Sequence, residues 1–216
     1  MKYMVIDLEM CKVPKAMRKT GYHRSQEIIQ IGAVLVDEAY EITEKFSTYV
    51  CPVYGQIDAK IRKLTGITNE HVKDAPKLND ALCQLENWLG EREVTAVSWS
   101  ESDLGQLKNE METKGLHNDT VESLFEHWMD CQKTFTDIID RGKAFRLDEA
   151  LILADIVQEG EAHDGLTDAY NTAKLFIKME TTPEFEFQAI YEAARNEEVE
   201  HLQFSIGELL AGAIIH

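Results

Sequence analysis

The sequence predicts an α/β protein built on a mixed five-stranded sheet with helices on its flanks. Strand-like apolar runs come first, over residues 3–9, 28–37 and 44–51. Their short connections make them antiparallel neighbours, so the first three strands should form a meander. From residue 58 onward, helical patterns alternate with two further strands. A meander followed by such alternation is typical of a mixed sheet covered on both faces.

Local patterns justify each element of the first half. The third strand alternates Phe46, Thr48 and Val50 toward one face. A helix is predicted over 58–64, and a second over 77–89 follows the start signal Asp74-Ala75-Pro76. One face of that second helix is apolar, through Leu78, Ala81, Leu82, Leu85 and Leu89.

The second half continues with a strand over 94–99 and a helix over 102–114 that Gly115 ends. A short strand over 128–131 and helices near 132–140, 147–156 and 165–179 complete the predicted domain. Pro183 marks the one boundary. We therefore expect a domain over residues 1–180 and a helical extension over 181–216 packed on it, because the extension is short for a separate domain. A partner subunit that covers its apolar end, residues 204–215, is the alternative.

Composition sets the class of protein. The 216 residues are 44% hydrophobic and 28% charged, as in an ordinary globular protein. With no apolar run of 18 residues and a strand at the N-terminus, we expect neither a membrane span nor a secretory signal, and hence a cytoplasmic protein. The four cysteines show no Cys-x-x-Cys pair, which argues against a zinc site and favours reduced thiols.

Two acids interrupt the first strand, which otherwise has the composition of a buried strand. Side chains alternate along a strand, so Asp7 and Glu9 project from the same side. Buried unpaired carboxylates are costly, so the pair suggests a cation of the kind that oxygen ligands hold, Mg²⁺ or Mn²⁺. An exposed strand end with two solvated acids is the alternative.

Three further residues are candidates for the same site. A helical apolar pattern that starts near Asp164 or Gly165 places His163 on the loop before that helix and Asp168 in its early turns. Asp103 follows the strand over 94–99 and stands at the start of the next helix. Taken singly, Asp103 is also explained as an acid at a helix N-terminus, and His163 as a capping or surface histidine.

Together, Asp7-x-Glu9, then Asp103 after its strand, then His163-x-x-x-x-Asp168 resemble the DEDDh branch of the 3′-to-5′ exonucleases, which have a ribonuclease-H-like fold. Residues 27–33 (Glu-Ile-Ile-Gln-Ile-Gly-Ala) and 64–68 (Leu-Thr-Gly-Ile-Thr) support the likeness. Within the branch, the chain is most similar to the enhanced-RNAi-exonuclease and KapD-like members. The resemblance covers about residues 1–180, and its motifs occur in order at the right distances.

The resemblance implies a metal-dependent exonuclease. Asp7, Glu9, Asp103 and Asp168 would hold two Mg²⁺ or Mn²⁺ ions, and His163 would be the general base. The reaction would release nucleoside 5′-monophosphates from the 3′ ends of single-stranded RNA or DNA. A regulatory or nucleic-acid-binding protein that keeps the fold without cleaving is the alternative, and the presence of all five residues favours the enzyme. The extension after Pro183 keeps a homo-oligomer or a protein partner open.

A net charge of −17 contrasts with phosphate binding, which calls for basic surface. A local segment supplies it, because residues 12–24 contain no acid. Its basic residues make it a candidate for substrate binding, with a solvated loop as the alternative: Lys12, Lys15, Arg18, Lys19 and Arg24, beside His23.

Aliphatic residues near the acids are candidates for contact with the terminal base. These are Leu8 and Met10 beside the acidic pair, and Ile67 after Gly66 in the turn that resembles the family's substrate-side turn. Ordinary core packing is the alternative for each of the three aliphatic side chains.

Overall fold

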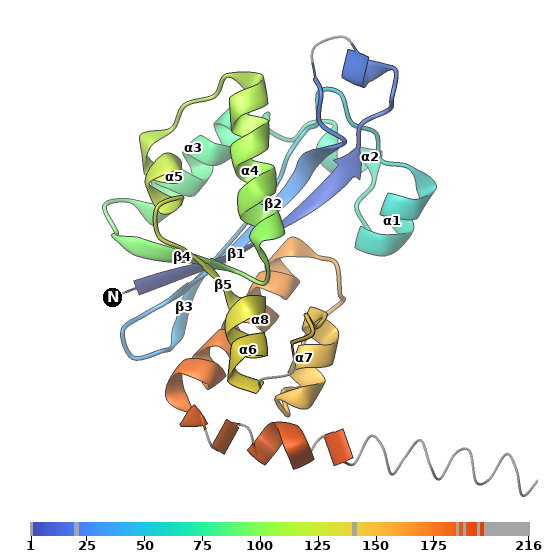
Figure 1. Ribbon diagram of the computed structural model, residues 1–216. Coiled ribbons are helices and arrows are strands. Elements are labelled where there is room, and N and C mark those ends of the chain that lie inside the picture. The colour runs from blue at the N-terminus through green and yellow to red at the C-terminus, as the bar shows by residue number, and fades with distance from the viewer. Residues whose placement is uncertain are drawn as a thin grey trace, which may run out of the picture.

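A five-stranded mixed sheet of order β3-β2-β1-β4-β5 forms the centre of the computed structural model (Figure 1). The structure describes residues 2–19, 22–139, 142–184, 186–187, 189–193 and 195–196. The strands are β1 (Lys2–Lys12), β2 (Gln26–Val36), β3 (Ile42–Tyr49), β4 (Val94–Ser98) and β5 (Trp128–Asp130). β1, β2 and β3 pair antiparallel, and β4 and β5 add in parallel. The predicted sheet and its meander are therefore confirmed.

The helices lie where the stronger patterns predict them: α1 (Ala59–Thr65), α3 (Leu78–Leu89), α4 (Glu101–Lys114), α6 (Cys131–Ile139), α7 (Leu147–Leu153) and α8 (Gly165–Thr181). Three short elements were not predicted: the 3₁₀ turn Met17–Lys19, α2 (Asn69–Val72) and α5 (Asp119–Leu124). Elements this short carry too few turns to show a hydrophobic period. The hydrophobic pattern of the sequence therefore did not show them.

The predicted helix over 147–156 is wrong at its C-terminal end. α7 ends at Leu153, because Asp155 adopts a left-handed conformation with φ 52°. The N–H of Ile156 then donates to the carbonyl of Leu151 at 2.8 Å, the bond that closes a Schellman turn. The apolar period continues through this turn, so it could not mark the end of the helix.

Alternation along β1 assigns its side chains to two cores, one on each face of the sheet. Met4, Ile6 and Leu8 belong to the first core, with α3, α4 and α5. Val5 belongs to the second core, with α6, α7 and α8. Asp7 and Glu9 continue the series of Val5 and therefore lie on the face that α8 covers. The two-residue period thus places both acids beneath one helix.

The segment after Pro183 begins with helical backbone at residues 184, 186–187, 189–193 and 195–196. Phe187 and Tyr191 are buried in the second core, and the Phe187 ring meets Phe135 edge to face at 5.9 Å. The apolar end over 204–215 lies outside the described residues. The division into a domain over 1–180 and a packed extension over 181–216 stays a prediction.

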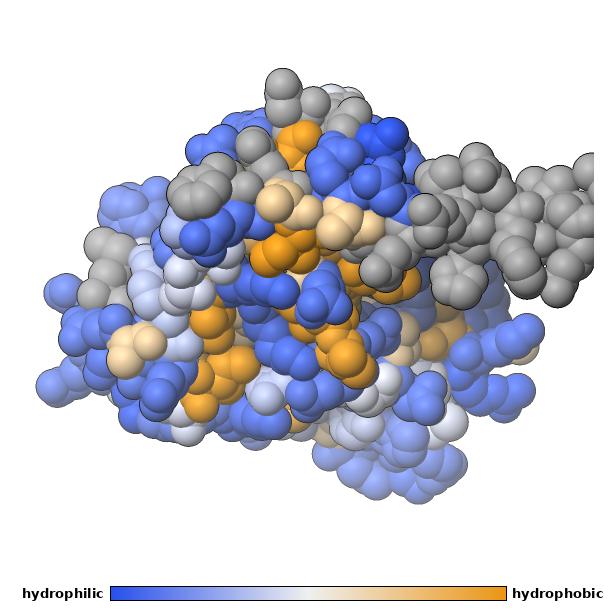
Figure 2. Space-filling model, turned by 90° about the horizontal axis from the view of Figure 1, so that it is seen from below, coloured by the Kyte–Doolittle hydropathy of each residue, from blue (hydrophilic) through white to orange (hydrophobic). Residues whose placement is uncertain are grey.

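The lower face of the molecule, seen in Figure 2, is mainly hydrophilic with a central band of hydrophobic residues. Ile152 of α7 and Val157 after it are among the large hydrophobic side chains that remain exposed. Within the described ranges, no helix is long and apolar enough to cross a membrane. The four cysteines are free.

Two glycines bring the start of α8 into contact with the sheet. Gly32 of β2 pairs with Asp7, and a Cβ added to it would lie 2.1 Å from the carbonyl carbon of Gly165. Gly165 in turn lies near the carbonyl of Asp7, at 3.3 Å from its ideal Cβ position. The backbone of α8 therefore touches the strand beside the acidic pair.

We expect Gly32→Ala to destabilise the protein by about 3 kcal/mol, because backbone atoms on both sides must separate to admit the methyl group. Urea or thermal unfolding measures the effect. Gly105→Ala is the matched control. Its Cβ would meet nothing within 4 Å in the middle of α4, so it should stabilise by about 0.5–1 kcal/mol. Wild-type stability in Gly32→Ala would contradict the close packing.

Candidate functional site

The acidic pair lies where β1 extends past β4. Pairing with β4 ends at Val5, whereas pairing with β2 continues through Asp7 and Glu9. A register shift follows directly after Glu9. The edge of β1 beyond Val5 is therefore free to meet the helix that follows β4.

Asp103, in the first turn of α4, occupies that edge. Its Oδ1 accepts the backbone N–H of Leu8 at 3.1 Å, and the residue is only 5% exposed. A buried strand N–H requires a partner, and here the carboxylate replaces the missing strand. This bond fixes Asp103 on the segment of β1 between Asp7 and Glu9.

The start of α8 supplies the remaining residues. Asp164 is the N-cap, and its Oδ1 accepts the N–H of Thr167 at 2.9 Å. His163 precedes it in a left-handed conformation with φ 64°. The backbone N–H of His163 donates to Oδ2 of Asp168 at 2.9 Å. One turn of chain thus holds the histidine and the acid beside each other.

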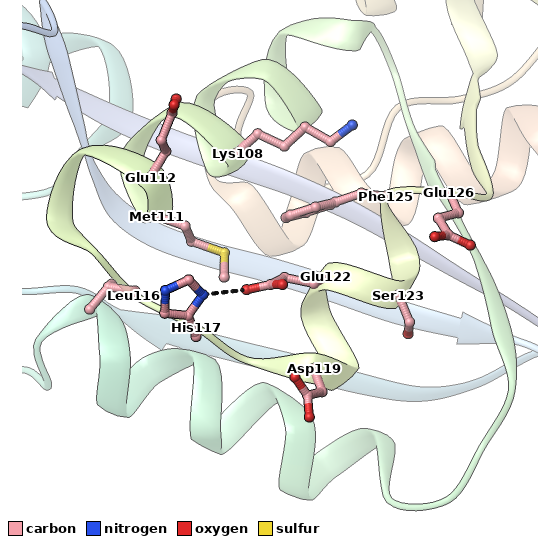
Figure 3. A pocket seen from close by; sticks show the side chains of 10 residues that line it. All are labelled: Lys108, Met111, Glu112, Leu116, His117, Asp119, Glu122, Ser123, Phe125 and Glu126. Atoms are coloured by element: carbon pink, nitrogen blue, oxygen red, sulfur yellow. Dashed lines mark ion pairs between the residues drawn. The ribbon is translucent and has the colours of Figure 1, made fainter.

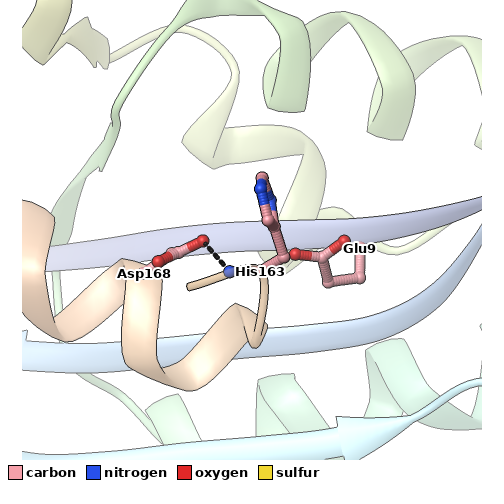
Figure 4. Close-up of side chains that lie close together, drawn as sticks. All are labelled: Glu9, His163 and Asp168. Carbon is pink, nitrogen blue, oxygen red and sulfur yellow. Dashed lines mark hydrogen bonds between the residues drawn. The ribbon is translucent and has the colours of Figure 1, made fainter. Parts of the chain in front are cut away.

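Glu9, His163 and Asp168 form a cluster that suits a metal ion. One ligand atom from each residue lies within 4.8 Å of the others. Figure 4 shows the three side by side, contributed by β1, by the loop before α8 and by α8 itself. Carboxylate oxygens, such as those of Glu9 and Asp168, are the ligands that Mg²⁺ and Mn²⁺ prefer.

Burial and mutual repulsion raise the pKa values of the four acids at the site, Asp7, Glu9, Asp103 and Asp168. Burial is the largest cause for Asp7, whose pKa lies well above the ordinary value, and Asp103, Asp168 and Glu9 add their negative charges. For the same reasons Glu9 has a pKa of about 8 and Asp103 of about 7, and burial also raises the pKa of Asp168. A divalent cation would let all four ionise, so the donor set fits the predicted metals.

A pocket of about 690 Å³ opens onto this cluster. Asp7, His163 and Asp168 contribute to its lining. Lys60 and Leu64 of α1, Trp99 after β4 and Arg146 before α7 line it as well. Phe145 is a second aromatic residue in the lining, so the pocket combines acids with two cationic side chains and two aromatic rings.

The predicted substrate-side aliphatic residues lie mostly in the core. Leu8 is 4% exposed in the first core, Met10 packs against that core, and Ile67 is 1% exposed in a third cluster. This burial favours the core alternative for Leu8 and Ile67. Gly66 is exposed and ends α1 with φ 70°, so its backbone remains available at the surface.

The predicted basic segment follows the end of β1. Lys12 and Lys15 are exposed, and Nε of Arg18 donates to the carbonyl of Val13 at 2.9 Å. Lys19 lies in the 3₁₀ turn, and its side chain is outside the described set. Lys12, Lys15 and Arg18 do not line the pocket itself. Their role in binding stays a prediction.

Comparison with known proteins identifies the family. A sequence model described as "Exonuclease" (RNase_T) matches residues 4–176, a span that contains all five predicted site residues. The chain belongs to the exonuclease family. Its motifs and fold are those of the DEDDh 3′-to-5′ exonucleases with a ribonuclease-H-like fold, and the predicted resemblance is confirmed.

Similar proteins include an ERI1 exoribonuclease 2 from Xenopus laevis, 32% identical over 74% of this chain and 26% of that protein. DNA polymerase III subunit epsilon from Aquifex aeolicus is 30% identical over 82% of this chain and 79% of its own length. The chain spans 26–32% of the length of the ERI1 relatives it matches. The solved structure of cell-death related nuclease 4 shares the fold, with a TM-score of 0.69 and 23% identity over 83% of this chain and 63% of that one.

Two residues of the site had no role in the sequence prediction. Asp164 adds negative charge that raises the pKa of both Asp7 and Glu9. Gln30, inside the quoted β2 motif, is the register partner of Glu9. A polar residue between the apolar residues of β2 was the available signal, but Asp164 and Gly165, which bind the Gln30 amide, lie more than a hundred residues away.

We expect the metal-free protein to lose stability as pH rises. The pKa of Glu9 is 4.5 ordinarily and about 8 when folded, so between these values the folded state binds more protons than the unfolded state. The stability that Glu9 contributes is complete below its ordinary pKa, and it is lost as pH rises through the pKa of the folded state. Mg²⁺ or Mn²⁺ should therefore raise the melting temperature most at the upper end of the range.

Thermal melting in EDTA and in Mn²⁺, from pH 4.5 to about pH 8, measures the pH dependence of stability and the stabilisation by metal. Glu9→Gln should flatten the pH dependence and weaken the metal effect. Glu91→Gln, a change at an exposed acid outside the site, should leave both as in the wild type. An unchanged pH slope in Glu9→Gln would contradict the electrostatic account.

Proposed function

We propose that the chain is a 3′-to-5′ exonuclease that hydrolyses single-stranded RNA or DNA and releases nucleoside 5′-monophosphates. The observation that carries this proposal is the gathering of Asp7, Glu9, Asp103 and Asp168 with His163 in one place, beside a pocket that three of these residues line. These residues come from three separate segments of the chain, namely β1, the start of α4 and the start of α8. They match the DEDDh motif in order and type, and membership of the family supports the activity.

The four carboxylates would hold two Mg²⁺ or Mn²⁺ ions. Bound ions would polarise the scissile phosphodiester and supply a reactive hydroxide at neutral pH. Ionised together, the four carboxylates would repel a phosphate group unless cations neutralised them. Activity should therefore depend strictly on divalent metal.

His163 is the proposed general base. An imidazole can take the proton of an attacking water at neutral pH. The backbone N–H of His163 donates to Asp168 and so holds the residue beside the acids. The imidazole ring takes no part in this bond. The imidazole is thus close to the carboxylates without being required as a ligand.

Substrate binding is proposed to rely on local positive charge. Lys60 and Arg146 line the pocket. The hydrogen bond from the N–H of Ile61 is the largest cause that lowers the pKa of Asp58. The positive charges of Lys12 and Lys60 lower it further, because both lysines lie near this carboxylate. The segment with Lys12, Lys15, Arg18 and Lys19 therefore begins beside the α1 wall of the pocket. With a net charge of −17, such a protein would grip a short single strand at this place.

We expect Asp7→Asn to abolish turnover, because it removes a carboxylate from the centre of the charge cluster. His163→Ala should lower the rate by about 10²–10⁴-fold, the usual contribution of a general base, and leave Mn²⁺ binding nearly intact. Mn²⁺-dependent digestion of a short oligonucleotide gives the rate, and calorimetry gives metal binding.

His117→Ala is the matched histidine control. His117 follows α4 at the end opposite Asp103 and contacts Glu122 at 3.4 Å in a second pocket (Figure 3). The lining of that pocket contains none of the five site residues. This variant should keep wild-type activity. Full activity in Asp7→Asn would refute the proposed site.

Digestion of end-labelled RNA and DNA oligonucleotides with Mg²⁺ tests polarity and sugar preference together. A 5′ label should give a ladder that shortens from the 3′ end, and a 3′ label should appear at once as mononucleotide. The relatives include proteins named for RNA and for DNA, so both sugars belong in the assay. Internal cuts or shortening from the 5′ end would contradict the proposal.

A further inference from the structure

The amide of Gln30 connects the sheet to the loop that carries His163. Gln30 is 2% exposed in β2, directly opposite Glu9. Its Oε1 accepts the N–H of Gly165 at 3.0 Å, and its Nε2 donates to Oδ2 of Asp164 at 2.9 Å. A longer contact of 3.4 Å joins Nε2 to Oγ of Ser47. Both ends of one buried amide therefore bind adjacent residues at the start of α8.

These bonds fix Asp164 completely. One carboxylate oxygen of Asp164 accepts from Thr167 as the helix cap, and the other accepts from Gln30. The preceding residue is His163, whose own N–H binds Asp168. The path of the chain through His163 is thus set by hydrogen bonds on both sides of the residue.

The other end of the loop is held independently. The side-chain amide of Asn171, which is fully buried, accepts from the N–H of Glu159 at 3.0 Å and donates to its carbonyl at 2.9 Å. Only residues 160–162 separate Glu159 from His163. Gln30 therefore controls the end of the loop next to the catalytic cluster, and Asn171 controls the far end.

The pair Gln30–Asp164 is matched in hydrogen-bonding type. Glutamine can accept from Gly165 and donate to a carboxylate at the same time. Glutamate at position 30 would accept from Gly165 but could not donate, and two carboxylates would face each other. Asparagine at position 164 opposite Gln30 would have only one oxygen to serve the Thr167 N–H and the Gln30 amide. Each single change leaves a mismatch, and the two together restore complementary groups with the total charge unchanged.

We infer that Gln30 is a positioning residue that sets the place of His163 through its bonds to Asp164 and Gly165. The inference rests on the proposed function, because it assigns Gln30 to the reaction in which His163 is the base. Gln30 does not touch the substrate in this account. It acts on the rate through the loop geometry, since a displacement of about 1 Å in a catalytic group costs about 10²-fold.

A double-mutant cycle tests the inference. Wild type, Gln30→Glu, Asp164→Asn and the double variant are compared in single-turnover cleavage of a short single-stranded oligonucleotide at saturating Mn²⁺. All assays are run well below the melting temperature of each protein. We expect Gln30→Glu to lose about 10²-fold in rate with little change in KM, and the double variant to recover most of the loss.

Ser47→Ala is the control, because it removes only the 3.4 Å contact of the same amide. It should keep the wild-type rate. A wild-type rate in Gln30→Glu, or a double variant no faster than Gln30→Glu, would overturn the inference. If Gln30→Glu does not fold, Asp164→Asn alone decides: a reduced rate supports the inference, and a wild-type rate overturns it.

The wild-type protein separates this inference from the proposed function. Cleavage by wild type together with an unaffected Gln30→Glu rejects the positioning role alone. Absence of metal-dependent cleavage by the wild type rejects the proposed function, and the positioning role with it.

Discussion

The accumulation of negative charge at one buried position is the constraint that governs this structure. Asp7, Glu9, Asp103 and Asp168 lie close enough that burial and mutual repulsion keep their pKa values high. Two unit charges 4 Å apart repel by about 4 kcal/mol at an effective dielectric near 20. A fold that served stability alone would not place them together. Binding of divalent cations explains why the four carboxylates lie together.

Backbone groups hold this arrangement in place. The end of β4 leaves the N–H of Leu8 for Asp103, and the left-handed turn at His163 directs a second N–H to Asp168. The contact of Gly165 with Gly32 brings α8 close enough for these bonds to meet. Asp103 and Asp168 are thus fixed by neutral donors, which orient a carboxylate without neutralising it. The charge remains for a metal to balance.

A second group of buried acids, Glu27 and Glu110, has a cationic side chain as its partner. Glu27 accepts three backbone N–H groups and the ammonium of Lys114, which also binds Glu110 at 2.8 Å. Burial alone would raise the pKa of Glu27, yet the hydrogen bond and charge of Lys114 lower it below the ordinary value. There the chain provides its own cation, and the network holds the loop over residues 53–55 in place. The contrast shows that the unpaired acids around Asp7 are a specific feature of the site.

The sequence by itself determined the sheet, the stronger helices and the five residues of the motif. Strand alternation placed Asp7 and Glu9 on one face, and helical period located α3, α4 and α8, because these signals are local. Tertiary structure alone decided the end of α7 at Asp155, the short helices α2 and α5, the burial of Leu8 and Ile67, and the bonds of Gln30 to Asp164 and Gly165. The burial of Leu8 and Ile67 and the bonds of Gln30 depend on contacts between residues far apart in the chain, and the short helices and the end of α7 fall where no hydrophobic period marks them. A single sequence carries no local pattern that pairs position 30 with position 164.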